Sequence, residues 1–407
     1  MGVLIACAVV FFLDLYVYKG ISTLTESLSK SGQTGVFFLF WTVRVALLLA
    51  FAYTITHFNE FRVNHPRAFI FWTSAFFVVT LPMLVFAAFH FANDLTNGVL
   101  WGVNKLANPG TDYSRRTFIT QAGLGVGALL MGGFFYGVTK GKFAFRVMKN
   151  QVVSSRLPKA FDGLKIVQIS DAHLGSFINN FEPVKKMVRM INDLEADYVV
   201  FTGDMVNSLS DEAEPWIDVF SGIKAKYGKF SIFGNHDYAD YGNYTESEKI
   251  KSRNRLKEIH KEMGFRLLED EHVELQRDGE KISLIGVHNW GAGFHQVGNL
   301  ANAMQNVNPD HFKILLSHDP THWEHQVLGK EDIHLTFSGH THGMQMGIEI
   351  PSLGIKWSPV KLRYKRWAGL YTEGEQHLHV NRGLGVLAFP GRLGMAPEIT
   401  LVELKSA

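Results

Sequence analysis

Residues 164–175 read LKIVQISDAHLG, a short apolar run followed at once by side chains that can bind metals. The segment Lys165–Ser170 is typical of a buried β-strand, because it is mostly apolar and bounded by polar residues. Asp171 and His173 follow this strand directly. Their spacing would place both side chains on the same side of an extended backbone. The stretch therefore predicts a strand that ends in a pair of possible ligands.

The same arrangement recurs along the chain after about residue 149. Four further predicted strands end in ligand-type residues: Tyr198–Thr202 before Gly203-Asp204, Phe230–Phe233 before Gly234-Asn235-His236-Asp237, Phe312–Ser317 before His318, and Ile333–Ser338 before Gly339-His340-Thr341-His342. Further predicted elements are the strands Ile282–Val287, His377–Asn381 and Ile399–Glu403 and the helices Phe181–Leu194 and Ser247–Met263. This order of strands and helices predicts an α/β core with stacked sheets. Strand ends of such sheets are where ligand sites collect.

These residue types suit a site with two metal ions. A pair of ions can clamp the attacking and leaving oxygens of a displacement at phosphorus, and it needs a carboxylate that can bridge plus neutral ligands. Carboxylates come from Asp171 and Asp204, and a neutral amide oxygen comes from Asn235. The candidate imidazoles belong to His173, His318, His340 and His342. A site of nitrogen and oxygen ligands without thiolates suits Mn, Fe, Zn or Co better than Mg or Ca.

The order DxH, GD, GNHD, H and GHTH resembles the calcineurin-like metallophosphoesterase family, over roughly Phe161 to Glu403. The C-terminal VNRGLG and PEITLVEL are similar to the bacterial, membrane-associated branch of that family. That branch includes twin-arginine-exported phosphodiesterases and a UDP-2,3-diacylglucosamine hydrolase of lipid A synthesis. The resemblance implies a four-layer α/β/β/α sandwich.

The resemblance also implies roles for individual residues. One divalent ion would be held by Asp171, His173 and His342, and the other by Asn235, His318 and His340. Asp204 would bridge both ions, and a metal-bridging hydroxide would be the nucleophile. His236 would not be a ligand; it would protonate the leaving oxygen or stabilise the charge that develops on it, with Asp237 orienting it. Two departures from the family pattern are Met344 after the GHTH motif and the segment His288-Asn289-Trp290.

The first third of the chain has a different composition. Residues 1–143 hold 10 Lys and Arg and 5 Asp and Glu, far fewer than the remainder. Four stretches are long and apolar enough, or nearly so, to cross a bilayer: Val3–Tyr18, Gly35–Phe58, Ala68–Phe91 and the Gly-rich Phe118–Val138. We therefore expect a transmembrane helical domain over 1–143, a linker over 144–160 and a metallophosphoesterase domain over 161–407.

Charge and cysteine content exclude several classes of protein. The net charge of +2 gives no support to nucleic-acid binding through a basic surface. Cys7 is the one cysteine, so the sequence has no intrachain disulfide and no cysteine-based metal site. Asp14 and Arg44 lie within apolar segments, where a charge is costly. We expect them to pair, the alternative being that each reaches an interface separately.

The sequence leaves the orientation of the membrane domain open. Four spans place five Lys and Arg on one side and six on the other, so positive charge does not decide. The segment Ser114–Ile119 (SRRTFI) resembles a twin-arginine export signal, which would place the catalytic domain outside the cytoplasm. The alternative is that Arg115 and Arg116 only anchor a helix end at the headgroups, and that the domain lies on the cytoplasmic face.

A basic and aromatic stretch follows the GHTH motif at Lys356–Trp367 (KWSPVKLRYKRW). Cations among aromatics suit a lipid headgroup interface, although a solvated basic loop is the simpler alternative. The candidate substrate residues are Lys361, Arg363, Lys365 and Arg366. We therefore expect a membrane-anchored phosphoesterase, more a phosphodiesterase than a monoesterase, that acts on a phosphodiester or a phospholipid-like substrate. The alternatives are a UDP-2,3-diacylglucosamine pyrophosphatase and a catalytically silent membrane scaffold.

Overall fold

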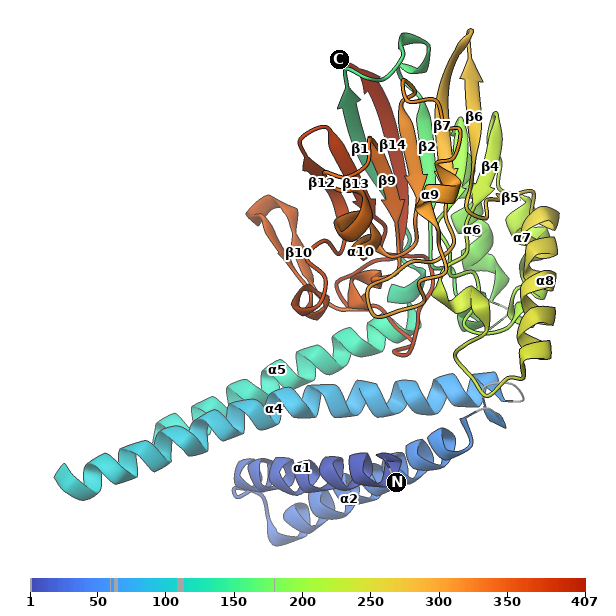
Figure 1. Cartoon of the computed structure of the whole chain (residues 1–407). Helices are drawn as coiled ribbons and strands as arrows, with labels where there is room; N and C mark the ends of the chain where they lie inside the picture. The colour runs from blue at the N-terminus through green and yellow to red at the C-terminus, as the bar shows by residue number, and fades with distance from the viewer. Residues whose placement is uncertain (1, 59, 62–64, 108–112, 179) are drawn as a thin grey trace. The chain divides into compact units, whose positions relative to one another are not determined.

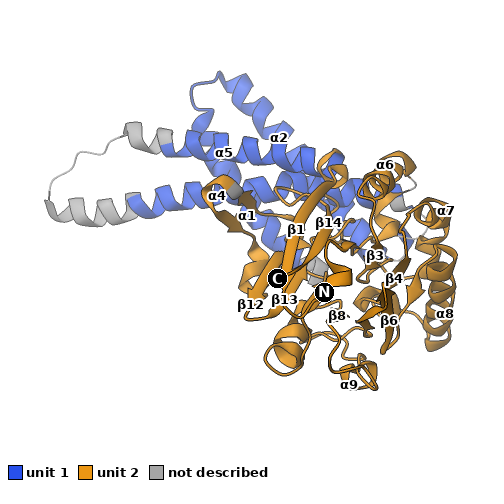
Figure 2. Ribbon diagram, turned by 90° about the horizontal axis from the view of Figure 1, so that it is seen from above, with its two compact units in different colours: residues 1–139 blue, residues 140–407 orange. Residues whose placement is uncertain are grey.

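The structure is a computed structural model that describes residues 2–58, 60–61, 65–107, 113–178 and 180–407. The chain divides into two compact units, residues 1–139 and residues 140–407, which Figure 2 shows in blue and orange.

Long apolar helices make up the first unit. They are α1 (Gly2–Leu24), α2 (Lys30–Thr56), α4 (Pro66–Ala107) and α5 (Tyr113–Thr139). Within the described residues, four segments are long and apolar enough to cross a membrane: Ile5–Leu24, Lys30–Thr56, Arg67–Thr96 and Ile119–Thr139. The four expected membrane segments are therefore confirmed as apolar helices of sufficient length.

Asp14 and Arg44 form an ion pair within these helices, as expected. Arg44 on α2 donates from Nε to Asp14 Oδ1 on α1 at 3.0 Å, and a second guanidinium nitrogen lies 2.9 Å from the same oxygen. Arg44 also donates to the Thr80 hydroxyl on α4 at 3.1 Å. Both charged side chains are buried. One ion pair therefore ties α1 to α2, and a hydrogen bond extends it to α4.

The second unit is built on two six-stranded mixed sheets. The first sheet has the order β1 (Arg146–Ser154), β14 (Glu398–Ser406), β2 (Lys165–Ile169), β3 (Tyr198–Phe201), β4 (Gly228–Ser231) and β5 (Arg266–Leu267). The second has the order β12 (Gly369–Glu373), β13 (Gln376–Val380), β9 (Leu335–Ser338), β8 (Lys313–Leu316), β7 (Glu280–Gly286) and β6 (Glu271–Arg277). A separate hairpin pairs β10 (Ile348–Ile350) with β11 (Ile355–Trp357).

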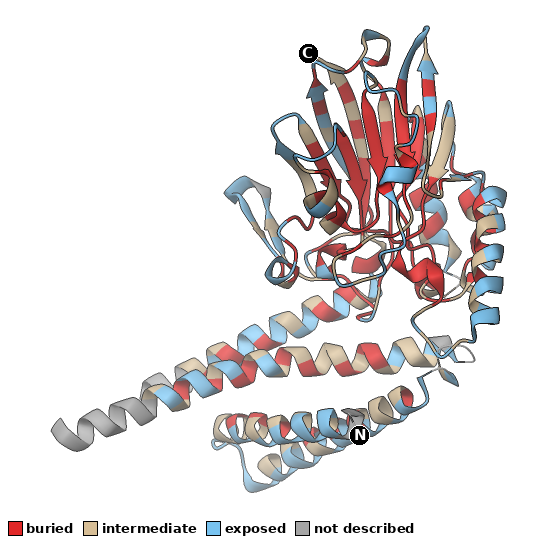
Figure 3. Cartoon of the chain, viewed as in Figure 1, coloured by how far each residue is buried: buried red, intermediate tan, exposed pale blue. Residues whose placement is uncertain are grey.

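The second unit has four layers, and an apolar cluster lies between each pair of neighbouring layers. Alternate residues of the two sheets, such as Ile166 and Leu316, fill the core between the sheets. The other face of the first sheet packs against α6 (Phe181–Asn192), α7 (Ile217–Ser221) and α8 (Glu246–Glu262). The other face of the second sheet packs against residues of α9 (Leu300–Ala303) and of the segment after α10 (Pro320–His322). Figure 3 shows the buried central strands in red. The expected α/β/β/α sandwich is confirmed.

The segment expected to be a linker is part of the sandwich. Strand β1 lies within residues 144–160 and pairs in parallel with β14 along its whole length. Its side chains alternate only weakly between buried and exposed, because β1 is an edge strand. The compact unit accordingly begins at Lys140, and the expected linker of 144–160 is wrong.

Candidate metal centre

Five strands of both sheets deliver the candidate ligands at their carboxyl ends. In the first sheet, β2, β3 and β4 run parallel and are followed by Asp171, Asp204 and Asn235. In the second sheet, β8 and β9 run parallel and are followed by His318 and His340. Parallel strands end at the same edge of a sheet. The edges of the two sheets lie close together, because Asp204 of the first sheet clusters with His318 and His340 of the second.

The backbone around these residues is not extended. Five of the candidate ligands have left-handed φ angles: Asp171 (49°), His173 (41°), Asp204 (60°), His340 (70°) and His342 (51°). Non-glycine residues rarely adopt this region, and such strain collects at functional sites. The expectation that an extended backbone places the Asp171 and His173 side chains on one side is therefore wrong. Tight left-handed turns aim these side chains instead.

Two glycines of the motifs are required by close approach. A Cβ on Gly203, whose φ is +93°, would lie 2.5 Å from the backbone nitrogen of Gly234 and 2.9 Å from Nδ1 of His318. A Cβ on Gly339 would lie 2.2 Å from the Asp171 carboxylate. Glycine at these positions lets neighbouring strand ends approach closely enough for their side chains to share one site.

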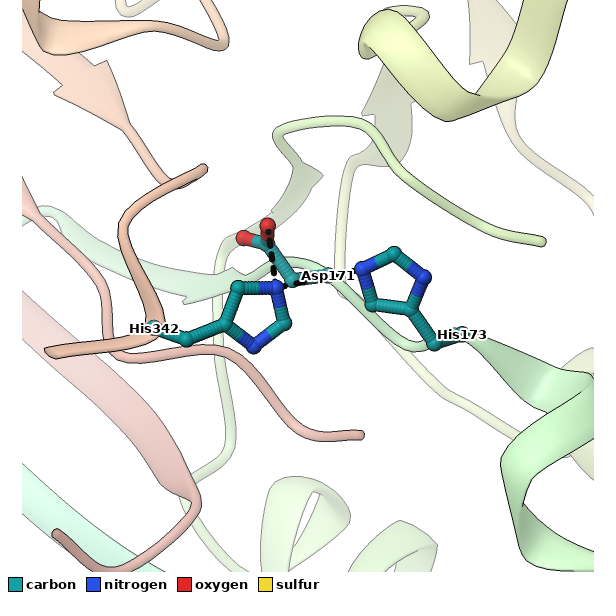
Figure 4. A group of neighbouring side chains, drawn as sticks. All are labelled: Asp171, His173 and His342. Atoms are coloured by element: carbon teal, nitrogen blue, oxygen red, sulfur yellow. Dashed lines mark hydrogen bonds and ion pairs between the residues drawn. The ribbon is translucent and has the colours of Figure 1, made fainter. Parts of the chain in front are cut away.

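The first cluster consists of Asp171, His173 and His342, which point toward one another in Figure 4. Nε2 of His342 lies 3.2 Å from Asp171 Oδ1 and 3.1 Å from Nε2 of His173. All three residues are buried. Ligands at about 2.0–2.1 Å from a tetrahedral ion lie roughly 3.3 Å from one another, so these separations fit a metal ion.

The second cluster consists of Asp204, His318 and His340. Nε2 of His318 lies 3.1 Å from Asp204 Oδ2, and it is buried without a hydrogen-bond partner. Nδ1 of His340 lies 2.8 Å from the Asn235 amide oxygen, which brings the predicted fourth ligand to the same place. A buried imidazole nitrogen without a hydrogen bond is the donor that a metal ion satisfies, so these residues also fit one.

Asp204 connects the two clusters. Its Oδ2 lies 3.7 Å from Nε2 of His173 in the first cluster and 3.1 Å from Nε2 of His318 in the second. Its Oδ1 accepts a hydrogen bond from the backbone N–H of His236 at 2.8 Å, which fixes the rotation of the carboxylate. The position predicted to bridge two ions therefore has one oxygen between both clusters.

Several contacts orient the ligands from behind. Nδ1 of His318 donates to the Thr202 carbonyl at 2.7 Å, so Nε2 of this ring is directed at the cluster. Nε2 of His340 lies 2.8 Å from the Tyr364 hydroxyl and 3.4 Å from Asp319 Oδ2. These partners fix the ring orientations before any ion binds.

The charges of the site perturb its pKa values in opposite directions. Burial alone would raise the pKa of Asp204, but the imidazoles of His318 and His236 outweigh it and hold this pKa well below its usual range. Burial alone would lower the pKa of His318, but the Asp204 carboxylate raises it to about 10. Burial lowers the pKa of His340 to about 4. Ionised carboxylates beside a neutral His340 are the states in which these groups bind metals.

His236 lies at the edge of the first cluster. Its ring centroid is 4.9 Å from that of His173, and it stacks on Tyr241 at 4.1 Å. Nδ1 of His236 donates to the Asn207 carbonyl at 2.8 Å, which leaves Nε2 as the nitrogen available for proton transfer. The structure thus keeps His236 beside the ligands and out of both clusters.

Asp237 does not orient His236 in the structure. Its carboxylate accepts hydrogen bonds from the backbone N–H groups of Gly234, Asp204 and Met205 at 2.8–2.9 Å. Burial and the Asp204 charge raise the pKa of Asp237 to about 7. Asp237 therefore clamps the turns after β3 and β4 together, and the Asn207 carbonyl holds the ring that Asp237 was expected to hold.

The predicted substrate cations fall into two groups. Lys361, Arg363 and Lys365 are exposed, and the Arg363 guanidinium lies 4.8 Å from the ring centre of Phe294, which itself contacts His340 edge-on. Arg366 is buried in ion pairs with Glu324 at 2.9 Å and Glu373 at 2.6 Å. Its charge is already neutralised, so we do not expect Arg366 to bind substrate.

The departures from the family pattern have identifiable places. Met344 is exposed beside the first cluster's motif. The ring of His288 bonds through Nδ1 to the Tyr238 hydroxyl at 2.8 Å, and the Asn289 amide donates to the His295 carbonyl at 2.8 Å. These residues brace the loop after β7 and are not members of either cluster.

Sequence reasoning missed several residues around the site. Tyr364 was noted only as an aromatic of the basic stretch Lys356–Trp367, and Asp319 was not noted at all, although both contact His340. Arg392 is fully buried, and its guanidinium donates to the carbonyls of Gly383 and Gly385 at 3.0 and 2.6 Å beside Asp171. Burial lowers the pKa of Arg392 to about 9. Nothing in the local sequence signals the contacts of Tyr364 and Asp319 with His340, because each pair lies more than 20 residues apart in the chain.

The comparisons with known proteins agree with this geometry. Residues 1–142 match the family model "Probable Calcineurin-like phosphoesterase, transmembrane domain", and residues 164–344 match "Calcineurin-like phosphoesterase". The chain is 33% identical over 303 residues to the uncharacterized metallophosphoesterase YkuE of Bacillus subtilis, which covers 72% of this chain and 98% of that protein.

Two other relatives carry a fuller description. A bovine "Transmembrane protein with metallophosphoesterase domain" is 31% identical over 63% of this chain, and this chain spans only 56% of its length. The UDP-2,3-diacylglucosamine pyrophosphatase LpxG of Chlamydia muridarum is 28% identical over 56% of this chain and 81% of that protein. Taken with the two ligand clusters, these matches show that the chain is a membrane protein that belongs to the calcineurin-like metallophosphoesterases.

Proposed function

We propose that the chain is a membrane-anchored phosphoesterase that holds two divalent metal ions and hydrolyses a phosphodiester or phospholipid-like substrate. The observation that carries the proposal is the position of Asp204 Oδ2, 3.7 Å from the first cluster's His173 and 3.1 Å from the second cluster's His318. Asp171, His173 and His342 hold one ion. Asn235, His318 and His340 hold the other, and Asp204 is shared. Manganese, iron, zinc and cobalt all suit these ligands.

The reaction divides between the ions and the protein. Two such ions, when bound, supply an activated water and neutralise the charge of the phosphoryl oxygens. The Asn207 carbonyl accepts the hydrogen bond from Nδ1–H of His236, so in the imidazolium form the ring can pass its Nε2 proton to the leaving oxygen and become neutral. Arg363, exposed and packed on Phe294, attracts the anionic substrate to the same side of the site.

Substitution of His236 tests the chemistry separately from metal binding. Full-length protein is purified in detergent, loaded with manganese and assayed with bis-p-nitrophenyl phosphate and with p-nitrophenyl phosphate. We expect His236→Ala to lose about 100-fold or more of the turnover while it keeps its metal content. The matched control is His325→Ala, an exposed histidine outside both clusters. Unchanged turnover in His236→Ala would refute the assignment.

The same assay separates the enzyme from a silent scaffold. A scaffold would hydrolyse neither ester at any metal loading. The full set of candidate ligands, together with His236, favours chemistry, because a scaffold has no need to gather two carboxylates and four imidazoles in a buried site. Faster turnover of the diester than of the monoester would support a phosphodiesterase.

A second candidate is a UDP-2,3-diacylglucosamine pyrophosphatase, favoured by the 28% identity to LpxG. The substrate of such an enzyme is a lipid precursor on the cytoplasmic face. The side of the membrane on which the catalytic domain lies therefore distinguishes the two candidate functions. The side chains of Arg115 and Arg116 lie outside the described residues, and the export signal stays a prediction. A reporter fused after Ala407 that is active only outside the cytoplasm would support extracytoplasmic phosphodiesters or lipids if lit. A cytoplasmic reporter lit instead would support the lipid A precursor.

A further inference from the structure

The hairpin of β10 and β11 stands apart from the two large sheets. It forms a two-stranded sheet of its own, and Figure 1 shows it at the periphery of the second unit. It follows directly on the GHTH motif, and its sequence is rich in isoleucine. A two-stranded hairpin is rarely stable alone, so contacts with the domain or with a partner must support it.

The register of the hairpin separates two chemically different faces. Ile348 pairs with Trp357 and Ile350 pairs with Ile355, and directly opposite residues share a face. The intervening pair, Glu349 with Lys356, lies on the other face. The four apolar side chains are all exposed, between 38% and 54% of their full area. The hairpin is therefore amphipathic, with its apolar face turned away from the protein.

The polar face fastens the hairpin to the domain. Glu349 forms an ion pair with Arg382 at 2.7 Å. Arg382 is itself paired with the buried Glu398. Lys356 lies 5.0 Å above the ring centre of Trp367 and donates to the Ala368 carbonyl. These contacts hold the apolar face outward, because reversing the hairpin would break an ion pair and a cation–π contact.

Two further large apolar side chains near the hairpin in the sequence are exposed. Leu353 in the turn of the hairpin is 68% exposed and Leu362, just beyond β11, is 90% exposed. Seven of the thirteen exposed large apolar side chains described within residues 140–407 lie between Met344 and Leu362. We call Ile348, Ile350, Leu353, Ile355, Trp357 and Leu362 the apolar hairpin surface. Contiguous exposed apolar patches of this kind mark interaction sites.

Charge and tethering indicate what covers this surface. The exposed cations Lys361, Arg363 and Lys365 follow the hairpin closely in the sequence, and they complement the anionic headgroups of a lipid bilayer. Trp357 suits the boundary between headgroups and acyl chains. The same chain carries four apolar helices long enough to span a bilayer, so the domain is held at high effective concentration near that bilayer.

We propose that the apolar hairpin surface inserts into the interfacial region of the bilayer in which the chain is anchored. The Ser358 hydroxyl next to β11 donates to the Gly343 carbonyl at 2.7 Å, and the Thr341 hydroxyl donates to the Trp367 carbonyl. Insertion therefore brings the turn that carries His340 and His342 to the level of the headgroups. This role in presenting lipid phosphoesters rests on the proposed function, whereas the insertion itself does not.

Lipid-borne quenching tests the insertion directly. Replacing Cys7 by serine removes the one native cysteine, and Leu353→Cys then carries a fluorophore on the full-length chain in phosphatidylcholine–phosphatidylglycerol vesicles. The matched control is Gln276→Cys, an exposed position on β6. Lipids with brominated acyl chains should quench the Leu353→Cys label strongly and the control label little. A Leu353→Cys label that is not quenched, whether in water or covered by protein, overturns the proposal, and Leu362→Cys repeats the test independently.

Turnover separates the insertion from the proposed function. The double variant Leu353→Glu with Leu362→Glu should lose about tenfold or more of the hydrolysis of a vesicle-embedded phosphodiester, since each large apolar side chain contributes that much to partitioning. Hydrolysis of water-soluble bis-p-nitrophenyl phosphate should not change. Equal loss on both substrates contradicts a membrane role for the surface. If the wild type hydrolyses neither substrate, the proposed function fails, whereas the quenching result still decides the insertion.

Discussion

Replacing Tyr364 by phenylalanine tests whether His340 is a metal ligand held from behind. The Tyr364 hydroxyl lies 2.8 Å from Nε2 of His340, whereas Nδ1 of the same ring faces Asn235. With Nδ1 as the ligand atom, Nε2 carries the proton and donates to the tyrosine oxygen. Tyr364→Phe removes this acceptor and leaves Asp319 Oδ2 at 3.4 Å as the nearest alternative. The ring of Tyr364 is buried, so its packing is retained.

The size of the effect follows from the kind of contact that is lost. Partners that orient a metal-bound histidine are worth about 10–100-fold in metal affinity, or about 1.4–2.8 kcal/mol. Only one ion should be affected, because His340 belongs to only one of the two clusters. Calorimetric titration of chelator-treated full-length protein with manganese should therefore show one weakened binding step and one unchanged step.

A matched control guards against a general effect on the loop. The hydroxyl of Tyr371 accepts a hydrogen bond from the backbone N–H of Trp367 at 3.1 Å and contacts no candidate ligand. Tyr371→Phe should leave both binding steps unchanged. The reasoning is refuted if Tyr364→Phe binds manganese like the wild type, or if both steps weaken equally in the two variants.

Three further predictions concern the membrane helices, the loss of stability at acidic pH and the role of Asp237. Asp14→Ala or Arg44→Ala alone should lower the free energy of unfolding by about 3–5 kcal/mol, because each leaves a buried charge unpaired, and the double variant should lower it by clearly less than the sum. Thermal unfolding in detergent measures these losses, and additive losses would contradict the pairing. His260 is fully buried without a hydrogen-bond partner, and burial lowers its pKa to about 3, so the unfolded state binds a proton first as the pH falls. The free energy of unfolding should therefore fall by about 1.4 kcal/mol per pH unit between the unfolded pKa of 6.5 and the folded pKa of about 3. His260→Leu should flatten that slope, and an unchanged slope in denaturant titrations would contradict the assignment. Asp237→Asn should destabilise the domain, since the carboxylate clamps backbone and does not touch His236. Loss of turnover without any loss of thermal stability would instead support the orienting role.

The sequence predicted the parts of the fold in which local pattern and structure agree. Strands such as Lys165–Ser170 are buried on both faces, so their apolar runs are readable, and each is followed by a motif with a fixed place. Edge strand β1 was missed because only part of its sequence is buried. Hairpin β10–β11 was missed because its apolar side chains are exposed, and exposure has no local signature.

The site was predictable in composition and less so in geometry. The seven candidate ligands were identified by type and order, and the structure brings them together. Their left-handed backbone was not predictable from spacing. Arg366 is neutralised by Glu324, which is 42 residues away, and the backbone groups that Asp237 accepts hydrogen bonds from belong to turns after two different strands. Contacts between residues that lie far apart in the chain cannot be predicted from a single sequence.

The stoichiometry of metal binding tests the central claim most directly. Full-length protein freed of metal by chelator is titrated with manganese, alongside the variants His342→Ala and His318→Ala, which each remove a ligand from a different cluster. The account predicts two ions per wild-type chain and the loss or weakening of a different binding step in each variant. A single ion in the wild type, or the same step lost in both variants, would contradict it.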